Sequence, residues 1–424
     1  MKSNKLHTLL FTAFAAAALG FSSCSNDVGV QEEVDNMTQQ TIFVYFPWSG
    51  SASDQGLYRD LCHNVDSMKA GILSNKGLGT TRLCIFMAKS ISKSDLLELT
   101  YNADKAKIDT TWIEKDIEGT NYTTAEGITD LWNKVKKQAP ALNYAMIIGC
   151  HGAGWLYRDD WVTYTSSRSA ADNDLPLSYG PDPDHPVTRF FGSMSKANSN
   201  LMIDVETLAE GLKSALGGTK LQYIIFDACY MDNVETAYAL KDVTNHMVAS
   251  ASEIMSAGIP YKSAWNYICS STPNYSGIVS TFYNFYKNYS YPYGNMAAVD
   301  CRQLDKLASI MKELNASYKL SDSIPVDSLG YTDGYKPHMF FDLECYVDSL
   351  HPDDDLKSRF KTQLNTTVIA HQNTEKAFTA LTYWPQPQRI YPIKHYCGLT
   401  ISDPSTHDVA VNGREKTVWW KATH

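Results

Sequence analysis

The 424-residue sequence lacks the short motifs by which the commonest hydrolases and nucleotide-dependent enzymes are recognised. It contains no Cys-x-x-Cys pair, no HExxH, no Walker loop, no GxSxG elbow and no Cys/His spacing typical of zinc sites. These absences exclude the common metallopeptidase, nucleotide-dependent and serine-hydrolase classes. We therefore expect neither a bound metal nor a cofactor.

Basic patches are also missing from the chain. The net charge is −9, and no stretch combines Lys and Arg with interleaved aromatic residues. This argues against a nucleic-acid partner. The nine cysteines are sparse, and a chain of this length can bury a large core without disulfides.

The N-terminus has the pattern of an export signal. A positively charged start is followed by an apolar stretch over residues 8–21, which is too short for a comfortable membrane span. Ser22 and Ser23 then precede Cys24, as at a bacterial lipoprotein cleavage site. We expect residues 1–23 to be a signal peptide and Cys24 to be lipidated, which would anchor the exported protein to a bacterial membrane, in the periplasm or at the cell surface. Ordinary secretion without the lipid is the alternative.

Patterns typical of strands and helices alternate along the rest of the chain, which favours an α/β sheet. Thr123 and Glu126 have the spacing of a capping box, and Gly217 is a helix stop signal. Asp232 or Asn233 can cap the helix that ends near residue 241. The patterns predict strands at 41–46, 82–88, 145–150, 223–226, 246–252 and 398–401, and helices at 57–69, 124–138, 205–216, 233–241, 302–314 and 354–370.

Two of the predicted strands end in residues that can carry chemistry. The apolar segment 145–150 runs into His151 and Gly152, and the segment 223–226 runs into Asp227, Ala228 and Cys229. Open parallel sheets build their active sites where the carboxyl ends of the strands meet. A thiol and an imidazole that meet there suit nucleophilic catalysis by a Cys–His pair.

The surrounding residues resemble a known family. IIGCHGAGW, FDACYMDNVETAYAL and SASEIMSAGIPY, in this order, are similar to segments of the clostripain family of cysteine peptidases, over roughly residues 41–405. The resemblance implies a caspase-like α/β fold with a mostly parallel central sheet and helices on both faces. We expect a flexible tether over 24–40, a catalytic domain over 41–300 and a C-terminal α/β extension over 301–424 packed on that domain.

The resemblance also implies roles for single residues. Cys229 would be the nucleophile and His151 its partner, with the backbone N–H groups of Gly152 and Cys229 forming an oxyanion hole. Asp227 would lie in a pocket for basic side chains, because it shares a strand face with Cys229. Ser252 would help to line the substrate cleft. Cys229 precedes a predicted helix, whose N-terminus would favour the thiolate.

Specificity for basic residues, with Arg preferred over Lys, stays open at this point. The segment 254–259 is apolar where family members commonly have acidic and Gly/Trp-rich residues. If those side chains fill the pocket, a neutral residue would be preferred and Asp227 would be structural.

Self-cleavage is a further expectation, since several family members cut themselves after the catalytic His. Residues 156–200 are mostly polar and contain Pro, as exposed loops do. The candidate cut points are Arg158, Arg168, Arg189 and Lys196.

We therefore predict an exported, clostripain-like cysteine endopeptidase that acts on peptides or proteins. Two alternatives remain open from the sequence: a catalytically inactive binding lipoprotein on the same fold, and an acyltransferase that uses the same Cys–His dyad.

Overall fold

The computed structural model describes residues 38–47, 57–90, 92–167, 201–290, 294–381 and 390–424. Residues 39–424 form one compact unit. The expected signal peptide, Cys24 and nearly all of the expected tether lie outside the described residues. Within the described ranges, no helix is long and apolar enough to cross a membrane.

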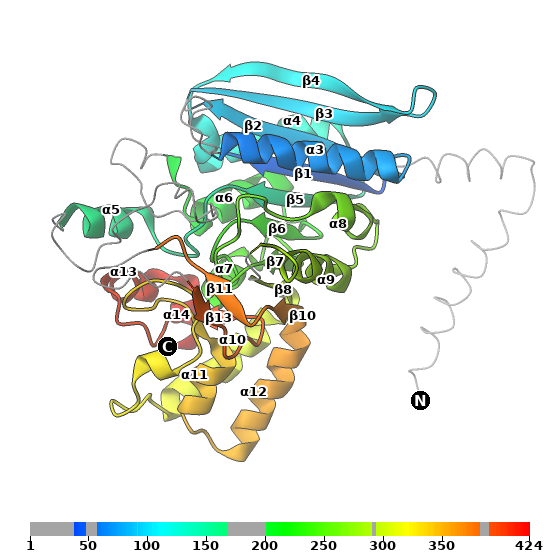
Figure 1. Ribbon diagram of the computed structural model, residues 1–424. Helices are drawn as coiled ribbons and strands as arrows, with labels where there is room; N and C mark the ends of the chain where they lie inside the picture. Colours follow the sequence, from blue (N-terminus) through cyan, green and yellow to red (C-terminus); the bar gives the residue numbers. More distant parts are fainter. Residues whose placement is uncertain (1–37, 48–56, 91, 168–200, 291–293, 382–389) are drawn as a thin grey trace, which may run out of the picture. The chain divides into compact units, whose positions relative to one another are not determined.

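Strands and helices alternate through much of this unit (Figure 1). The strands are β1 (Gln40–Phe46), β2 (Thr81–Ser90), β3 (Lys93–Asn102), β4 (Lys107–Glu118), β5 (Asn143–Gly149), β6 (Ile224–Asp227), β7 (His246–Ala249), β8 (Asn295–Asp300), β9 (Phe341–Asp342), β10 (Val368–Asn373), β11 (Lys376–Phe378), β12 (Ile390–Pro392) and β13 (Thr400–Ile401). The helices are α3 (Tyr58–Ser74), α4 (Ala125–Gln138), α5 (Arg158–Ser167), α6 (Val205–Leu216), α7 (Val234–Leu240), α8 (Tyr261–Ile268), α9 (Tyr275–Tyr286), α10 (Leu304–Ser317), α11 (Leu343–Ser349), α12 (Asp354–Thr367), α13 (Asp408–Gly413) and α14 (Val418–Thr423).

One nine-stranded sheet organises the unit, in the order β10-β8-β7-β6-β5-β1-β2-β3-β4. The pairs β7–β6, β6–β5, β5–β1 and β1–β2 are parallel. The strands at both edges pair antiparallel. The sheet is therefore parallel at its centre, as predicted, and β10 from the expected C-terminal extension forms one of its edges.

Helices cover both faces of the sheet, as predicted (Figure 1). Successive side chains of a strand point to opposite faces. In the central strands Ile147 and Ile225 pack in the core beneath α3, α8 and α9, whereas Ile148 and Phe226 pack in the core beneath α4, α6 and α7. Because both faces are covered, these strands are apolar throughout, as central parallel strands usually are.

Helix α6 confirms its predicted bounds, and Gly217 ends it in the left-handed conformation, with φ of 59°. The capping box predicted for α4 is wrong. Thr124, not Thr123, caps α4, because its side chain accepts a hydrogen bond from the N–H of Gly127. The hydroxyl of Thr123 instead donates to the carbonyl of Thr120.

Other departures from the sequence predictions are local. The antiparallel hairpin β3–β4 was not predicted, and helix α5 occupies the first part of the expected loop 156–200. Helix α12 ends at Thr367 rather than at residue 370, because the chain passes directly into β10.

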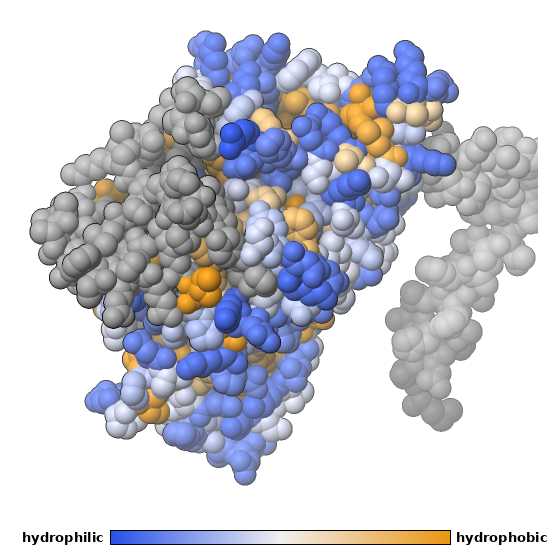
Figure 2. Space-filling view, viewed as in Figure 1, coloured by the Kyte–Doolittle hydropathy of each residue, from blue (hydrophilic) through white to orange (hydrophobic). Residues whose placement is uncertain are grey.

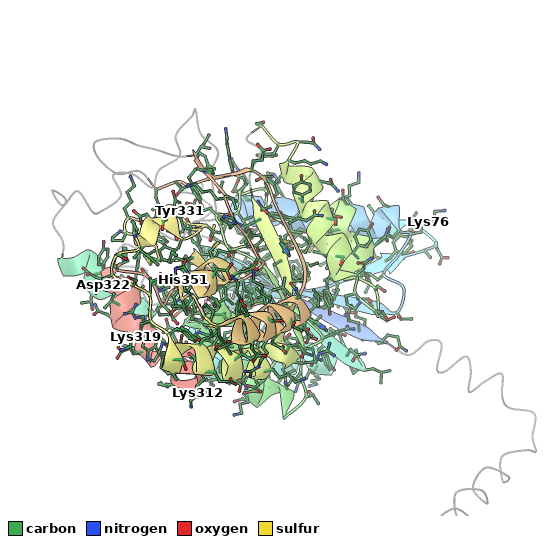
Figure 3. All side chains as sticks on the ribbon, turned by 90° about the horizontal axis from the view of Figure 1, so that it is seen from below. Lys76, Lys312, Lys319, Asp322, Tyr331 and His351 are labelled. Carbon is green, nitrogen blue, oxygen red and sulfur yellow. The ribbon has the colours of Figure 1, made fainter. Side chains whose placement is uncertain are left out.

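The visible face in Figure 2 is mostly hydrophilic, with small scattered apolar areas. The exposed large apolar residues of the described part lie on separate elements; they include Leu73, Trp112 and Leu142. Apolar side chains scattered singly in this way need no functional explanation. Figure 3, seen from below, shows the exposed Lys312, on α10, well apart from the exposed Lys76, which follows α3.

Candidate active site

The carboxyl ends of β5 and β6 bring the two candidate catalytic residues to the same level. The strands are parallel neighbours, and their register pairs Gly149 with Asp227. His151 and Cys229 each follow two residues after this pair. The segments that carry the imidazole and the thiol therefore leave the sheet side by side, at the carboxyl ends of these two central strands.

A glycine makes the close approach of these two segments possible. A Cβ on Gly152 would lie 2.2 Å from the carbonyl oxygen and 2.9 Å from the amide nitrogen of Cys229. Real Cβ atoms do not approach backbone so closely, so no other residue fits without moving one segment. The contact joins the backbones of the two residues expected to form the oxyanion hole.

The thiol of Cys229 is fully buried. It accepts a hydrogen bond from the backbone N–H of Ile254, with 3.2 Å between N and Sγ. The thiol in turn donates to the carbonyl of Ile254, with 3.7 Å between Sγ and O. The first bond favours a thiolate, whereas the second favours the neutral thiol. Helix α7 begins at Val234, and Asn233, one of the two predicted caps, accepts a hydrogen bond from the N–H of Thr236. The effect of this helix N-terminus on the thiol stays a prediction.

Asp227 lies on the same strand face as Cys229 and is fully buried. One carboxylate oxygen accepts a hydrogen bond from the hydroxyl of Tyr261, at 2.8 Å, and the other accepts one from the N–H of Ile259, at 3.2 Å. The segment that the sequence marked as unusual therefore covers this carboxylate directly.

Ser252 lies just beyond β7 and is also fully buried. Its N–H donates to the side-chain oxygen of Asn295 at 3.2 Å, and its carbonyl accepts from the N–H of Tyr230 at 3.2 Å. Through this second bond Ser252 ties the end of β7 to the residue that follows Cys229.

A mainly apolar pocket opens beside His151. Ile148, Phe226 and Ala228 line it from the sheet, and Leu208 of α6 lines it from the opposite wall. These sheet residues alternate with Asp227, so the pocket and the Asp227 carboxylate lie on opposite faces of β6. The apolar pocket is therefore separate from the expected pocket for basic side chains.

Sequence reasoning missed two buried residues next to the thiol, Tyr230 and Glu253. The tyrosine hydroxyl donates to a carboxylate oxygen of Glu253 at 2.8 Å. Neither residue belongs to a spacing pattern that carries chemistry. Only the contact between the ends of β6 and β7 reveals the pair.

Comparisons with known proteins identify the family. The family model of the clostripain family matches residues 180–375. A secreted C11 cysteine protease from Bacteroides thetaiotaomicron, "iotapain", is 38% identical, with 92% of this chain and 100% of that chain covered and a TM-score of 0.78. An inactive zymogen C11 protease from Parabacteroides distasonis is 26% identical, with 92% and 99% covered and a TM-score of 0.71.

A third structure, a clostripain from Bacteroides thetaiotaomicron in complex with the peptide inhibitor BTN-VLTK-AOMK, is 42% identical. It covers 55% of this chain and 99% of its own, with a TM-score of 0.50. The search of curated proteins finds no match.

Proposed function

Since this chain belongs to the clostripain family and is a cysteine endopeptidase, we propose that Cys229 is its nucleophile and His151 its general base. The observation that carries the proposal is the register of β5 and β6. It delivers both residues to one sheet edge, where Gly152 lies against the backbone of Cys229.

The proposed reaction follows from these groups. His151 takes the thiol proton, and the Cys229 thiolate attacks the carbonyl carbon of the scissile peptide bond. The N–H groups of Gly152 and Cys229 stabilise the negative oxygen of the tetrahedral intermediate. The imidazolium then gives its proton to the leaving amine, and water hydrolyses the thioester to release the second product.

We also propose that the enzyme prefers Arg, and then Lys, before the cut bond. Two observations support a basic residue at this position: the Asp227 carboxylate lies on the strand face of Cys229, and the related clostripain binds an inhibitor whose peptide part is written VLTK. The order of Arg before Lys rests on hydrogen-bond geometry. A carboxylate pairs with a guanidinium through two parallel hydrogen bonds, which an ammonium cannot match. For a basic side chain to reach it, the contacts from Tyr261 and Ile259 must open.

Matched peptides with Arg, Lys, Ala and Leu before the cut test this preference. We expect Asp227→Asn to lower kcat/KM for the Arg peptide about 10- to 100-fold, the range for a hydrogen bond to a charged group. Its values for the Ala and Leu peptides should change little. Tyr261→Phe removes a hydrogen bond from the same carboxylate but keeps the charge, so it should keep the preference for Arg. Faster cleavage of the Ala or Leu peptide by the wild type would rule out the basic pocket.

Self-cleavage is proposed as the route to the active form, because the Cys229 thiol is fully buried and a substrate cannot reach it without a rearrangement. Arg158 is part of α5, and its N–H donates to the side chain of Asp204. Arg168, Arg189 and Lys196 lie outside the described residues. Arg168 is the favoured cut point, since it lies in the polar run Thr165–Ala170.

Intact mass spectrometry tests the self-cleavage. The wild type should give two fragments whose masses place a single cut directly after one basic residue. Purified Cys229→Ala should keep the full-length mass. The same full-length mass for both proteins would exclude self-processing but would leave the proposed dyad untouched.

Lipid anchoring is proposed from the residues before Cys24, and export is in keeping with the secreted relative. Detergent phase separation of cell extracts distinguishes the lipidated form from ordinary secretion. Wild-type protein should enter the detergent phase, and Cys24→Ser should not. Recovery of both forms in the aqueous phase would contradict the anchor.

A further inference from the structure

Tyr230, directly after the proposed nucleophile, has an unusual backbone conformation. Its φ is +60°, in the left-handed region that bulky residues rarely adopt. The other described non-glycine residues with positive φ are all exposed, whereas Tyr230 is fully buried. Strained conformations of this kind persist only where the surroundings hold them, and they cluster at functional sites.

Contacts from several elements hold Tyr230 in place. Its N–H donates to the carbonyl of Ser252, and its own carbonyl accepts a hydrogen bond from the side chain of Asn233 at 2.7 Å. Its ring stacks on Phe340, with 5.5 Å between the ring centroids and 19° between the planes. Its hydroxyl donates to Glu253.

Glu253 is also held by the C-terminal third of the chain, which donates in part to the same carboxylate oxygen as Tyr230. The hydroxyl of Thr379 donates to one carboxylate oxygen at 2.5 Å, and the N–H of Ala380 lies within 3.1 Å of both oxygens. Glu253 is fully buried, so these donors replace the water that its carboxylate would otherwise bind. Both its side chain and the main chain that follows it are therefore held firmly.

These contacts close a ring around the thiol. The ring runs from Cys229 to Tyr230, across the side-chain hydrogen bond to Glu253, and on to Ile254, whose N–H donates back to the Cys229 sulfur. A shift of Glu253 would move the Ile254 amide away from the sulfur. A shift of Tyr230 would move Cys229 itself.

We propose that Tyr230 and Glu253 are positioning residues that hold the Cys229 thiol and the Ile254 N–H in reactive alignment. The proposal rests on the proposed role of Cys229 as nucleophile. Both side chains are fully buried and hydrogen-bonded to each other. The pair acts through the geometry of the sulfur, where small misplacements are costly in rate.

Steady-state kinetics of Tyr230→Phe and Glu253→Gln test the pair, together with the rate at which iodoacetamide alkylates Cys229. Both variants nearly keep the size of the side chain, but Tyr230→Phe removes the hydrogen bond between the two residues and Glu253→Gln weakens it. We expect kcat to fall about tenfold or more while KM stays within about twofold, because a misplaced reacting group lowers the rate more than the binding. Alkylation of Cys229 should slow in parallel.

Tyr223→Phe is the matched control. Tyr223 directly precedes β6, at the end of the strand away from Cys229, and is also fully buried. Its hydroxyl donates a hydrogen bond to the carbonyl of Ile268 at 3.0 Å. It should lose stability as Tyr230→Phe does but keep its kcat and its alkylation rate.

Equal kcat values for Tyr230→Phe and Tyr223→Phe would overturn the positioning role while the peptidase mechanism stands. A KM effect alone would overturn it as well, since that would place the pair in substrate binding. Loss of the proposed nucleophile is recognised separately, by activity that survives in Cys229→Ala.

Discussion

Replacement of Cys229 by Ala should abolish peptide hydrolysis, and His151→Ala should do nearly the same. Each single change should lower kcat roughly 10⁴-fold or more, since the nucleophile and its base act as a unit. For the same reason the double variant should lose little more than either single one. Steady-state kinetics on one good peptide substrate, with the three variants purified in parallel, measure this directly.

The matched control for the dyad is Cys84→Ala. Cys84 is a fully buried cysteine in β2 of the same sheet, and burial raises the pKa of its thiol to about 12. It should remain protonated and unreactive at neutral pH, so its loss should affect stability alone. Substantial activity in Cys229→Ala, or a comparable loss of activity in Cys84→Ala, would refute the assignment of the nucleophile.

Gly152→Ala should be nearly as damaging, although it removes no functional group. The added Cβ would overlap the backbone of Cys229, which cannot rotate away as a flexible side chain can. The two segments must separate, and the N–H groups that stabilise the negative oxygen then no longer converge. Loss of one such donor typically costs 10²- to 10³-fold in kcat. We expect kcat/KM to fall by roughly 100-fold or more.

Gly217→Ala controls for the general effect of changing a glycine. Gly217 has φ of 59°, and a Cβ there would meet no atom within 4 Å. The change should cost about 1–2 kcal/mol of stability through backbone strain alone, without altering kcat/KM. If Gly152→Ala retained wild-type kcat/KM, the close approach of the two segments would not serve catalysis.

Much of the sheet could be predicted because its central strands are short apolar runs. The segments that became β5 and β6 carry buried residues on both faces, and each run ends next to His151 or Cys229. The sequence could not specify their pairing. His151 and Cys229 each lie two residues beyond the paired residues Gly149 and Asp227, and only the register of the two strands reveals this.

The antiparallel hairpin escaped prediction for a physical reason. Strand β4 is an edge strand whose residues are mostly exposed or half-buried, so it has no continuous apolar run and no clean alternation. Its polar side chains are satisfied across the sheet instead, as Lys89 of β2 shows by pairing with Asp116. Partners of this kind are not visible in the local sequence.

The site itself shows the same limit. His151, Gly152 and Cys229 could be named as candidates from their places after strands together with the family resemblance, whereas the link between Tyr230 and Glu253 depends on a contact between separate loops. Asp227 lies between these cases. Its strand face was predictable, but its hydrogen bonds with Tyr261 and Ile259 come from a distant segment. The measured substrate preference decides whether Asp227 binds a basic side chain or is structural.

The most direct test of the account is the site of covalent modification by an irreversible peptide inhibitor with Lys or Arg next to its reactive group. Peptide mapping by mass spectrometry after labelling of the active protein should place the adduct on Cys229. His151→Ala should label far more slowly, because the thiolate would lose its partner. An adduct on any other cysteine, or equally fast labelling of Cys229 without His151, would contradict the proposed dyad.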